Sequence, residues 1–264
     1  MRFDVITLFP ELFAPFLSAG INRRAFETGA VELKLWQLRD YADGTYRRVD
    51  DRPFGGGPGM VLLAEPLEKC LQAIRHDRAL KNPYEKPVPV VLFSPIGQPL
   101  NHAGVEEWSQ SDGAILICGR YEGLDQRFID AHVDVQVSLG DFVLSGGEIA
   151  AIALLDAVAR LQPGVLNDEG SHQMDSFNPA LDGLLDCGHF TRPEVWKDIT
   201  VPPVLMSGHH AEITKWRRQQ SLVLTQKYRP DLIVGARLAG KLSDQDENFL
   251  FSLSASGLVE FKSN

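Results

Sequence analysis

Residues Ser138–Pro163 read SLGDFVLSGGEIAAIALLDAVARLQP, and this segment carries the strongest indication of how the chain folds. It contains the end of an extended run, a bend with several glycines, and a helix that is apolar around most of its circumference. Two loops upstream, FSPIG (Phe93–Gly97) and CGRYEGLD (Cys118–Asp125), also follow directly after apolar runs. Loops at the carboxyl ends of parallel strands hold small ligands in α/β proteins. The three loops therefore predict a ligand site at one edge of a parallel sheet.

Extended and helical segments alternate along the first part of the chain. Strands are expected at Arg2–Phe9, Val31–Leu38, Val88–Phe93, Gly113–Cys118 and Val133–Leu139. Helices are expected at Glu65–Ala79, Leu100–Gln110, Gly123–Ala131 and Gly146–Leu161. This alternation predicts an α/β fold with a mostly parallel sheet whose faces are covered by helices.

The second part of the chain has a different pattern. Residues 167–180 are polar, poor in apolar side chains and contain an Asn-Pro pair, which is typical of a linker. An extended piece is expected at Thr200–Met206, followed by a long helix that ends near Tyr228, and a last helix follows a capping box from Ser243 to Asp246. The predicted organisation is an α/β domain at 1–166, a linker at 167–180 and a smaller, mainly helical domain at 181–264.

Composition limits where the protein works. The three cysteines of this 264-residue chain include no close pair, which indicates a reduced compartment. The apolar amino terminus is interrupted by Asp4 and Glu11 and alternates over Phe3–Leu8, so a strand is a better interpretation than a signal peptide. No uncharged apolar stretch approaches the roughly 18 residues of a membrane span. We therefore expect a cytoplasmic protein without a membrane partner.

The charge of the chain restricts how it could bind a nucleic acid. A formal net charge of −9 argues against loose binding to a polyanion. A nucleic-acid substrate would have to be held by local clusters of basic side chains. Such clusters occur at Arg23–Arg24, Arg47–Arg52 and Lys215–Arg229. Each cluster taken alone is better explained as an ordinary solvated surface.

The segment DDRPFGGGPGM (Asp50–Met60) contains four glycines and two prolines, so regular structure is excluded there. It lacks the Gly-Lys-Ser/Thr of a nucleotide P-loop and also the dinucleotide-binding pattern. Two interpretations remain open at this point. The segment is either a tight surface turn or a flexible flap that places Asp50, Asp51 and Arg52 beside a substrate.

Two further residues allow both a structural and a functional interpretation. Arg160 lies near the end of the apolar helix, where Asp156, four residues earlier, is a suitable ion-pair partner. Asp175 follows in an Asp-Ser-Phe loop, where its side chain could simply cap a turn. Local spacing does not choose between these roles and a role in catalysis.

An ordered series of runs is similar to the bacterial tRNA (guanine-N1)-methyltransferases of the SPOUT class. The runs are DDRPFGGGPGM, SPIG, GRYEG with the following Asp125 and Arg127, GDFVLSGGE, DAVAR with PGVL, DSF, GLLDCGHFTRPEVW, VPPVLMSGHH and KWRRQQSL. They extend from Asp50 to Leu222, and chance does not reproduce so many motifs in one order.

The resemblance implies a trefoil knot in the carboxyl-terminal part of the α/β domain, a rare exception to the rule that chains do not knot. It also implies that the methyl donor S-adenosylmethionine binds bent in this knot, on three loops. The donor-binding residues carried over are Leu92, Phe93, Ser94, Pro95, Gly97, Gly119, Tyr121, Glu122, Gly123, Leu139, Gly140, Asp141, Phe142, Val143, Leu144, Gly146 and Gly147. A homodimer is expected in which each active site is shared between two chains.

The resemblance matches the catalytic base to Asp175 and the catalytic arginine to Arg160, acting on the guanine 3′ of the anticodon in tRNA. N1 of guanine carries a proton at neutral pH and becomes nucleophilic when Asp175 takes that proton. Arg160 can then stabilise the negative charge that spreads onto O6. The helical domain is expected to grip the tRNA. Candidate substrate-binding residues are Asp50, Arg52, Ser207, His209, His210, Lys215 and Arg217.

No residue is assigned as a metal ligand. The resemblance suggests Mg²⁺ as a cofactor besides the donor, and beyond carboxylates such as Glu122 the sequence offers no clear cation site. Cys187 and His189, with His209 and His210 downstream, do not have the spacing of a familiar zinc site.

Two rival functions are weighed against this one. A SPOUT ribose 2′-O-methyltransferase would act on a hydroxyl that has no acidic ring N–H, and it would leave the Asp175 loop and the SGHH and KWRRQQ runs unexplained. A non-catalytic RNA-binding module would have no reason to retain Asp175, Arg160 and all three ligand loops together. Both alternatives are distinguished from the main hypothesis by the methylated nucleoside that forms.

Overall fold

A computed structural model describes residues 1–84, 86–166 and 172–255. The chain divides into two compact units, Met1–Asn167 and Asp168–Asn264, and each is considered by itself below. The predicted division into 1–166, 167–180 and 181–264 stays a prediction, because residues 167–171 of the proposed linker lie outside the described residues.

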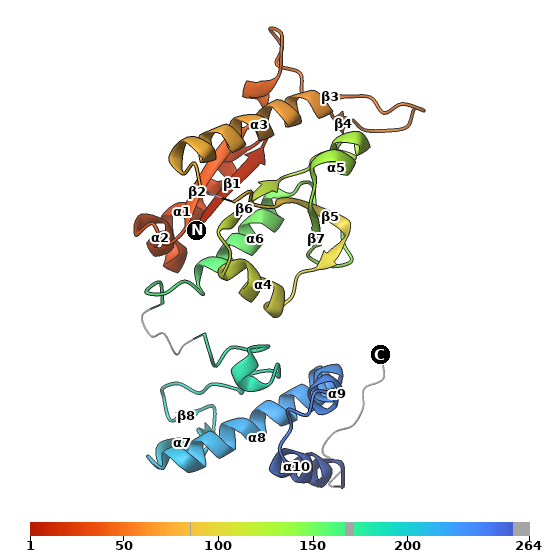
Figure 1. Ribbon diagram of the computed structural model, residues 1–264. Helices are drawn as coiled ribbons and strands as arrows, with labels where there is room; N and C mark the ends of the chain where they lie inside the picture. Colours follow the sequence, from red (N-terminus) through yellow and green to blue (C-terminus); the bar gives the residue numbers. More distant parts are fainter. Residues whose placement is uncertain (85, 167–171, 256–264) are drawn as a thin grey trace. The chain divides into compact units, whose positions relative to one another are not determined.

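The first unit is built on a five-stranded sheet with the order β2-β1-β6-β5-β7 (Figure 1). The strands are β1 (Arg2–Thr7), β2 (Glu32–Gln37), β5 (Val90–Pro99), β6 (Gly113–Ile117) and β7 (Val135–Ser138). Every pair of neighbours in this sheet runs parallel. The prediction of an α/β fold with a mostly parallel sheet is therefore confirmed. Parallel order also explains why β1 and β6 are buried along their whole length.

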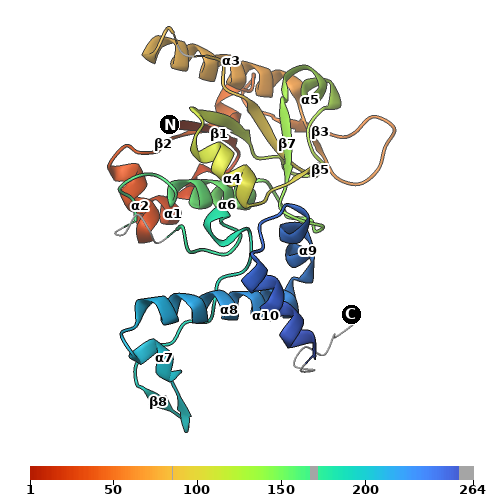
Figure 2. The same ribbon diagram turned by 60° about the horizontal axis from the view of Figure 1, so that its bottom comes forward.

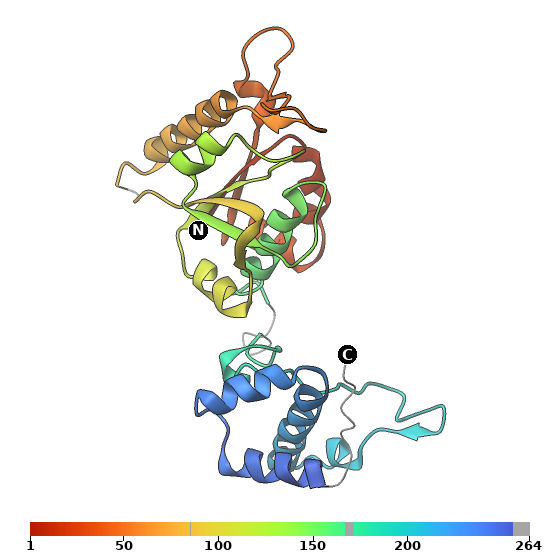
Figure 3. The same cartoon turned by 90° about the vertical axis from the view of Figure 1, so that its right-hand side faces the viewer.

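Helices cover both faces of this sheet (Figures 1 and 3). One face carries α3 (Ala64–Lys81) and α5 (Gln126–His132), and the other carries α1 (Ala14–Ser18), α2 (Gly20–Glu27), α4 (His102–Ser109) and α6 (Glu148–Ala159). Side chains alternate between the two cores with the period of a strand. In β6, Leu116 joins the core under α6, whereas Ile115 and Ile117 join the core under α3.

Short elements complete the first unit. They are the 3-10 helices η1 (Pro10–Phe13) and η2 (Leu38–Tyr41) and the antiparallel pair β3 (Asp50–Asp51) and β4 (Val61–Leu62). The expectation that Asp50–Met60 contains no regular structure is therefore wrong for Asp50 and Asp51, which form β3. Residues 52–60, between the two strands, are exposed along most of their length. The side chain of Phe54 in that segment is fully exposed.

A buried charge lies in the middle of strand β1. Asp4 is fully buried, and its carboxylate accepts hydrogen bonds from Arg2 at 2.6 Å, from Arg78 at 2.7 Å and from the indole nitrogen of Trp36 at 2.8 Å. Burying a charge is costly unless it is paired and hydrogen-bonded, and this carboxylate satisfies both conditions. The cluster links β1 to β2 and α3.

The second unit is mainly helical. Its elements are η3 (Pro179–Leu181), β8 (Val195–Trp196), β9 (Ile199–Thr200), α7 (Pro203–Met206), α8 (His210–Tyr228), α9 (Pro230–Leu238) and α10 (Asp244–Ala255). Helix α7 lies at the amino end of α8, and α9 and α10 lie toward its carboxyl end (Figure 2). The buried side chains of Leu184, Leu222, Ile233, Ala236, Leu250 and Leu253 form the core.

Two local predictions for this unit have different outcomes. The capping box is confirmed, because Ser243 and Asp246 exchange hydrogen bonds between side chain and backbone at 3.0 and 3.2 Å. The extended piece at Thr200–Met206 is wrong over most of its length, because Pro203–Met206 forms α7. Proline is suited to the first turn of a helix, where its missing N–H has no intrahelical partner.

Within the described residues, the structure contains no helix with both the length and the apolar character needed to cross a bilayer.

Candidate active site

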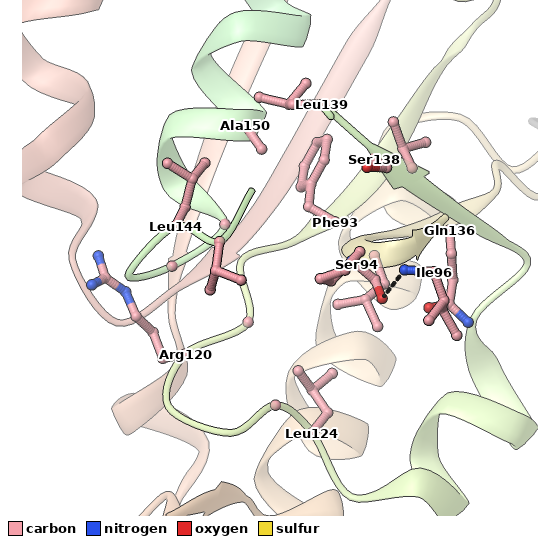
Figure 4. A pocket seen from close by; sticks show the side chains of 18 of the residues that line it. Phe93, Ser94, Ile96, Arg120, Leu124, Gln136, Ser138, Leu139, Leu144 and Ala150 are labelled. Carbon is pink, nitrogen blue, oxygen red and sulfur yellow. Dashed lines mark hydrogen bonds between the residues drawn. The ribbon is translucent and has the colours of Figure 1, made fainter. Parts of the chain in front are cut away.

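A cavity of about 440 Å³ lies in the first unit at the carboxyl ends of β5, β6 and β7 (Figure 4). Its wall is formed by the end of β5, the loop after β6 and the loop between β7 and α6, so the three loops predicted to form a ligand site do come together. The predicted donor-binding residues all line this cavity except Gly97 and Asp141.

Gly97 has a packing role instead of lining the cavity. A Cβ atom at this position would lie 2.4 Å from the backbone nitrogen of Val137, a distance that real Cβ atoms do not reach. The register between β5 and β7 shifts between Phe93 and Gln98, beside this contact. Gly97 therefore lets β5 pass against β7 where the strand is irregular.

The loops after β6 and β7 are in direct backbone contact. The amide of Gly147 donates a hydrogen bond to the carbonyl of Gly119 at 3.0 Å, and Arg120 forms an isolated antiparallel bridge with Gly146. A Cβ atom on Gly147 would lie 2.7 Å from the Cα of Cys118. A side chain at Gly147 would thus push apart the two loops that form the cavity wall.

The glycine-rich segment is also attached to the loop after β6. Glu122 donates its backbone N–H to the carbonyl of Met60 at 3.0 Å, and Leu62 donates to the carbonyl of Gly123 at 2.9 Å. A Cβ atom on Gly59 would overlap the Glu122 side chain. These contacts favour the interpretation of the segment as a flap beside the cavity, and they place its carboxyl end there.

The cavity wall combines apolar and polar residues. Phe93, Leu124 and Leu144 supply apolar surface, and Ser94 accepts a hydrogen bond from the backbone of Ile96 at 3.4 Å (Figure 4). Such a lining suits a small molecule that has an apolar body and a few hydrogen-bonding groups.

Sequence reasoning missed part of this wall. The additional lining residues are Ile96, Arg120, Leu124, Gln126, Ile129, Gln136, Val137, Ser138, Ser145 and Ala150. Some of these residues could have been predicted from their positions in the sequence. Arg120, Leu124 and Ser145 lie within or directly beside the quoted loops, whereas Gln136 and Ala150 belong to β7 and α6.

The two predicted catalytic residues belong to different units. Arg160 is the carboxyl cap of α6 in the first unit, and Asp175 lies in a turn of the second unit, where its amide donates to the carbonyl of His172 at 3.2 Å. Asp156, the alternative partner of Arg160, accepts a hydrogen bond from the side chain of Asn22. The roles of Arg160 and Asp175 in catalysis stay predictions.

The predicted tRNA-binding residues are found on two exposed surfaces, one in each unit. In the flap, Asp50 belongs to β3 and the amide of Arg52 donates to the Asp51 carboxylate at 2.7 Å. In the second unit, the hydroxyl of Ser207 accepts from the amide of His209 at 3.1 Å, directly before α8. His210, Lys215 and Arg217 are exposed on the first turns of that helix.

Arg218, which shares the basic run of Lys215 and Arg217, has a different role. Its guanidinium donates to Asp246 at 3.0 Å and to Asp182 at 2.8 Å, and its side chain is three-quarters buried. The hydrogen bond to Asp246 raises the pKa of Arg218 further above its usual range. Arg218 therefore links α8 to Asp182 and to Asp246 of α10. It does not belong to the predicted basic surface.

The described residues offer little for a metal ion. Among residues 1–84, 86–166 and 172–255, no three His, Cys, Asp or Glu side chains gather into a possible metal site. His189 instead contacts the Asp186 carboxylate at 2.9 Å. All three cysteines are free and buried.

The family described as tRNA (Guanine-1)-methyltransferase TrmD matches residues 1–235. A protein of Polaromonas sp. named tRNA (guanine-N(1)-)-methyltransferase is 70% identical over 253 residues, which cover 96% of this chain and 97% of the relative. Proteins of the same name from Paracidovorax citrulli and Bordetella pertussis are 66% and 53% identical over 254 residues, covering 96% of this chain and 99% and 98% of their own lengths.

The parallel sheet with its three-loop cavity and these similarities define the protein as a methyltransferase. The length of the match and the sequence identities identify the family. The chain belongs to the tRNA (guanine-1)-methyltransferase family.

Proposed function

We propose that this protein transfers the methyl group of S-adenosylmethionine to N1 of the guanine 3′ of the anticodon in tRNA. Membership of the family and the names of its relatives support the reaction. The observation that carries the proposal for this chain is the cavity at the carboxyl ends of β5, β6 and β7, which is lined by nearly all the residues expected to hold the donor.

The donor is proposed to occupy this cavity. Its size suits a small nucleoside-containing molecule, because ligand pockets of about 300–1,000 Å³ bury most of such a ligand. The apolar side chains of Phe93, Leu124 and Leu144 would contact a flat ring, and the glycine-rich loops leave backbone groups accessible for hydrogen bonds. The donor supplies an already activated sulfonium methyl group.

The chemistry left to the protein is activation and alignment of the guanine. Asp175 is proposed to take the N1 proton, a role that contributes roughly 10²–10⁴ in rate. Arg160 is proposed to stabilise the charge that develops on O6, by about 3 kcal/mol. In-line attack requires the two reacting atoms to be roughly 3–3.5 Å apart, and the flipped-out base and the donor loops would provide this alignment.

The proposed site combines residues of both units, since Arg160 and the cavity belong to the first unit and Asp175 belongs to the second. A homodimer in which each active site takes Asp175 from the other chain, as the family resemblance implies, is also part of the proposal. So is the trefoil knot around the donor. The close backbone contacts of Gly119, Arg120 and Cys118 with Gly146 and Gly147 support such a tightly packed crossing.

Magnesium and cellular location are minor parts of the proposal. The described residues do not fit a protein-held Mg²⁺ ion, because their carboxylates do not form a cluster of three possible ligands. The proposed location is the cytoplasm, because tRNA is the proposed substrate.

The reaction is tested with the purified full-length protein, unmodified tRNA transcript and S-adenosylmethionine labelled in its methyl group. We expect 1-methylguanosine as the labelled nucleoside, and no label in a matched transcript with adenosine 3′ of the anticodon. A 2′-O-methylated nucleoside would instead identify a ribose methyltransferase. Binding of tRNA without any transfer of label would identify a non-catalytic RNA-binding module.

A further inference from the structure

The guanidinium group of Arg120, in the loop after β6, makes three contacts. Its Nη2 atom lies 2.8 Å from Oε2 of Glu148, its Nη1 donates to the carbonyl of Ser145 at 3.3 Å, and its guanidinium carbon lies 4.4 Å from the ring centre of Phe9. In Figure 4 the guanidinium is directed away from Phe93 and Ser94, on the opposite side of the cavity. Arg120 is thus one of the residues that line the cavity, and its charge is paired with Glu148.

The carboxylate that receives Arg120 is completely buried. Glu148 is the first residue of α6, and its other oxygen accepts a hydrogen bond from the hydroxyl of Thr7 at 2.7 Å. The same hydroxyl accepts from the amide of Phe9 at 2.9 Å. Four groups from three separate segments are therefore linked in one chain of contacts: the end of β1, the loop after β6, and the start of α6.

Stability alone does not explain this ion pair. A buried ion pair is often no more stabilising than apolar side chains of similar volume. The amino end of a helix does favour an acidic side chain such as Glu148, but it does not require a partner arginine. What the pair does supply is a fixed geometry between two loops, because Arg120 belongs to one donor loop and contacts the carbonyl of Ser145 in the other.

The side chain of Arg120 packs directly against the backbone of the neighbouring loop. Arg120 bridges Gly146, and a Cβ atom on Gly146 would lie 2.2 Å from Nε of Arg120. The arginine side chain therefore lies directly across Gly146 of the neighbouring loop, and its guanidinium reaches the carboxylate of Glu148.

We infer that the Arg120–Glu148 pair, supported by Thr7, positions the two donor loops, and that donor affinity depends on it more than folding stability does. Both are positioning residues, since they act through the loops. The inference rests on the proposed donor site. It adds to that proposal a buried charge outside the donor contacts that sets the shape of the cavity.

The test measures donor binding by calorimetry, with S-adenosylmethionine and its demethylated product as the probes, in parallel with thermal unfolding. Glu148→Gln keeps the shape of the side chain and removes its charge, and we expect donor affinity to fall about tenfold, within the range for coupled neighbours. The KM for the donor should rise while the KM for tRNA stays the same. Arg120→Met should have a similar effect, and the double variant should lose no more affinity than either single variant.

The matched control is another buried carboxylate of the same unit. Asp4 is as fully buried as Glu148 and pairs with Arg78, but its contacts lie among β1, β2 and α3 and include none of the donor loops. Asp4→Asn should lower the unfolding temperature at least as much as Glu148→Gln and leave donor affinity within about twofold.

Two results would overturn the inference: unchanged donor affinity in folded Glu148→Gln, or an equal loss of affinity in the Asp4→Asn control. If Glu148→Gln does not fold, Arg120→Lys and Thr7→Val decide in the same assay. Arg120→Lys keeps the charge and should retain more donor affinity than Arg120→Met. Equal donor affinities of the lysine and methionine variants would also contradict the inference. Failure of the proposed donor site itself is recognised separately, because the unaltered protein would then not bind either probe.

Discussion

At the scale of single residues, the sharpest prediction concerns Asp175. Asp175→Asn keeps the size of the side chain and removes the proposed base, so single-turnover methyl transfer should fall by about 10²–10⁴. Donor affinity should not change, because the residues proposed to hold the donor belong to the other unit. Quenched-flow transfer and calorimetry on the same preparation measure the two quantities. Transfer by the asparagine variant at the original rate would show that Asp175 is not the base.

Residues that act through distant partners could not be identified from the sequence. Lys215, Arg217 and Arg218 look alike as a basic run, but Arg218 pairs with Asp182 and Asp246, which lie 36 and 28 residues away. Local spacing does not indicate such pairs. The close approach of two backbone segments at Gly147 was likewise not predicted, because it depends on Cys118, which lies far away in the sequence.

At the scale of elements, the strands of the sheet were predicted nearly in place. The signal is clearest for β1 and β6, whose apolar runs are buried along their whole length. The end of β5 was missed. Pro95 and Gly97 are residues that sequence rules exclude from regular strands, yet β5 continues to Pro99 past an irregular register. The same loop then contributes Ser94 and Ile96 to the cavity, so the irregular part of the strand became part of the candidate site.

Helix α8 provides a test of how this acidic protein holds RNA. Changing Lys215 and Arg217 to alanine should weaken tRNA binding and lower the slope of log affinity against log salt concentration by up to about one per lost phosphate contact. Donor affinity should stay the same. Filter binding of tRNA at several salt concentrations gives the slope.

Arg218→Ala is the comparison for this helix. It should leave the salt slope unchanged and lower the stability of the helical unit by roughly 1–3 kcal/mol, because Asp182 and Asp246 lose a charged partner. A salt slope that stays the same in the Lys215 and Arg217 variant would move the RNA-binding surface elsewhere, first to Arg47, Arg48 and Arg52 in and beside the flap.

At the scale of the whole molecule, the proposed sharing of each active site between two chains can be tested by a complementation experiment. Asp175→Ala chains lack the proposed base, and Gly147→Arg chains have a donor loop forced away from Cys118. Each homodimer should be inactive. Mixed dimers contain one site with an intact donor loop and an intact Asp175, so mixing followed by subunit exchange should restore part of the activity.

The control for this experiment is a mixture in which both chains carry Asp175→Ala. Exchange is verified with differently tagged chains that are purified together. Inactive mixed dimers would mean that each chain builds a complete site from its own two units. The sequence alone could not decide this, because the arrangement of two chains depends on surfaces that no local pattern describes.

The packing of Gly147 onto Cys118 also has a consequence for redox chemistry. Burial raises the pKa of the Cys118 thiol well above its usual range and raises that of Cys70 to about 12, and burial raises the pKa of Cys187 as well. The reactive form of a cysteine is its thiolate. All three thiols therefore stay protonated and shielded near neutral pH while the protein is folded, and peroxides or alkylating agents have no ready target among its cysteines. The burial of Cys118 beside the cavity wall thus also protects this part of the candidate site from oxidation.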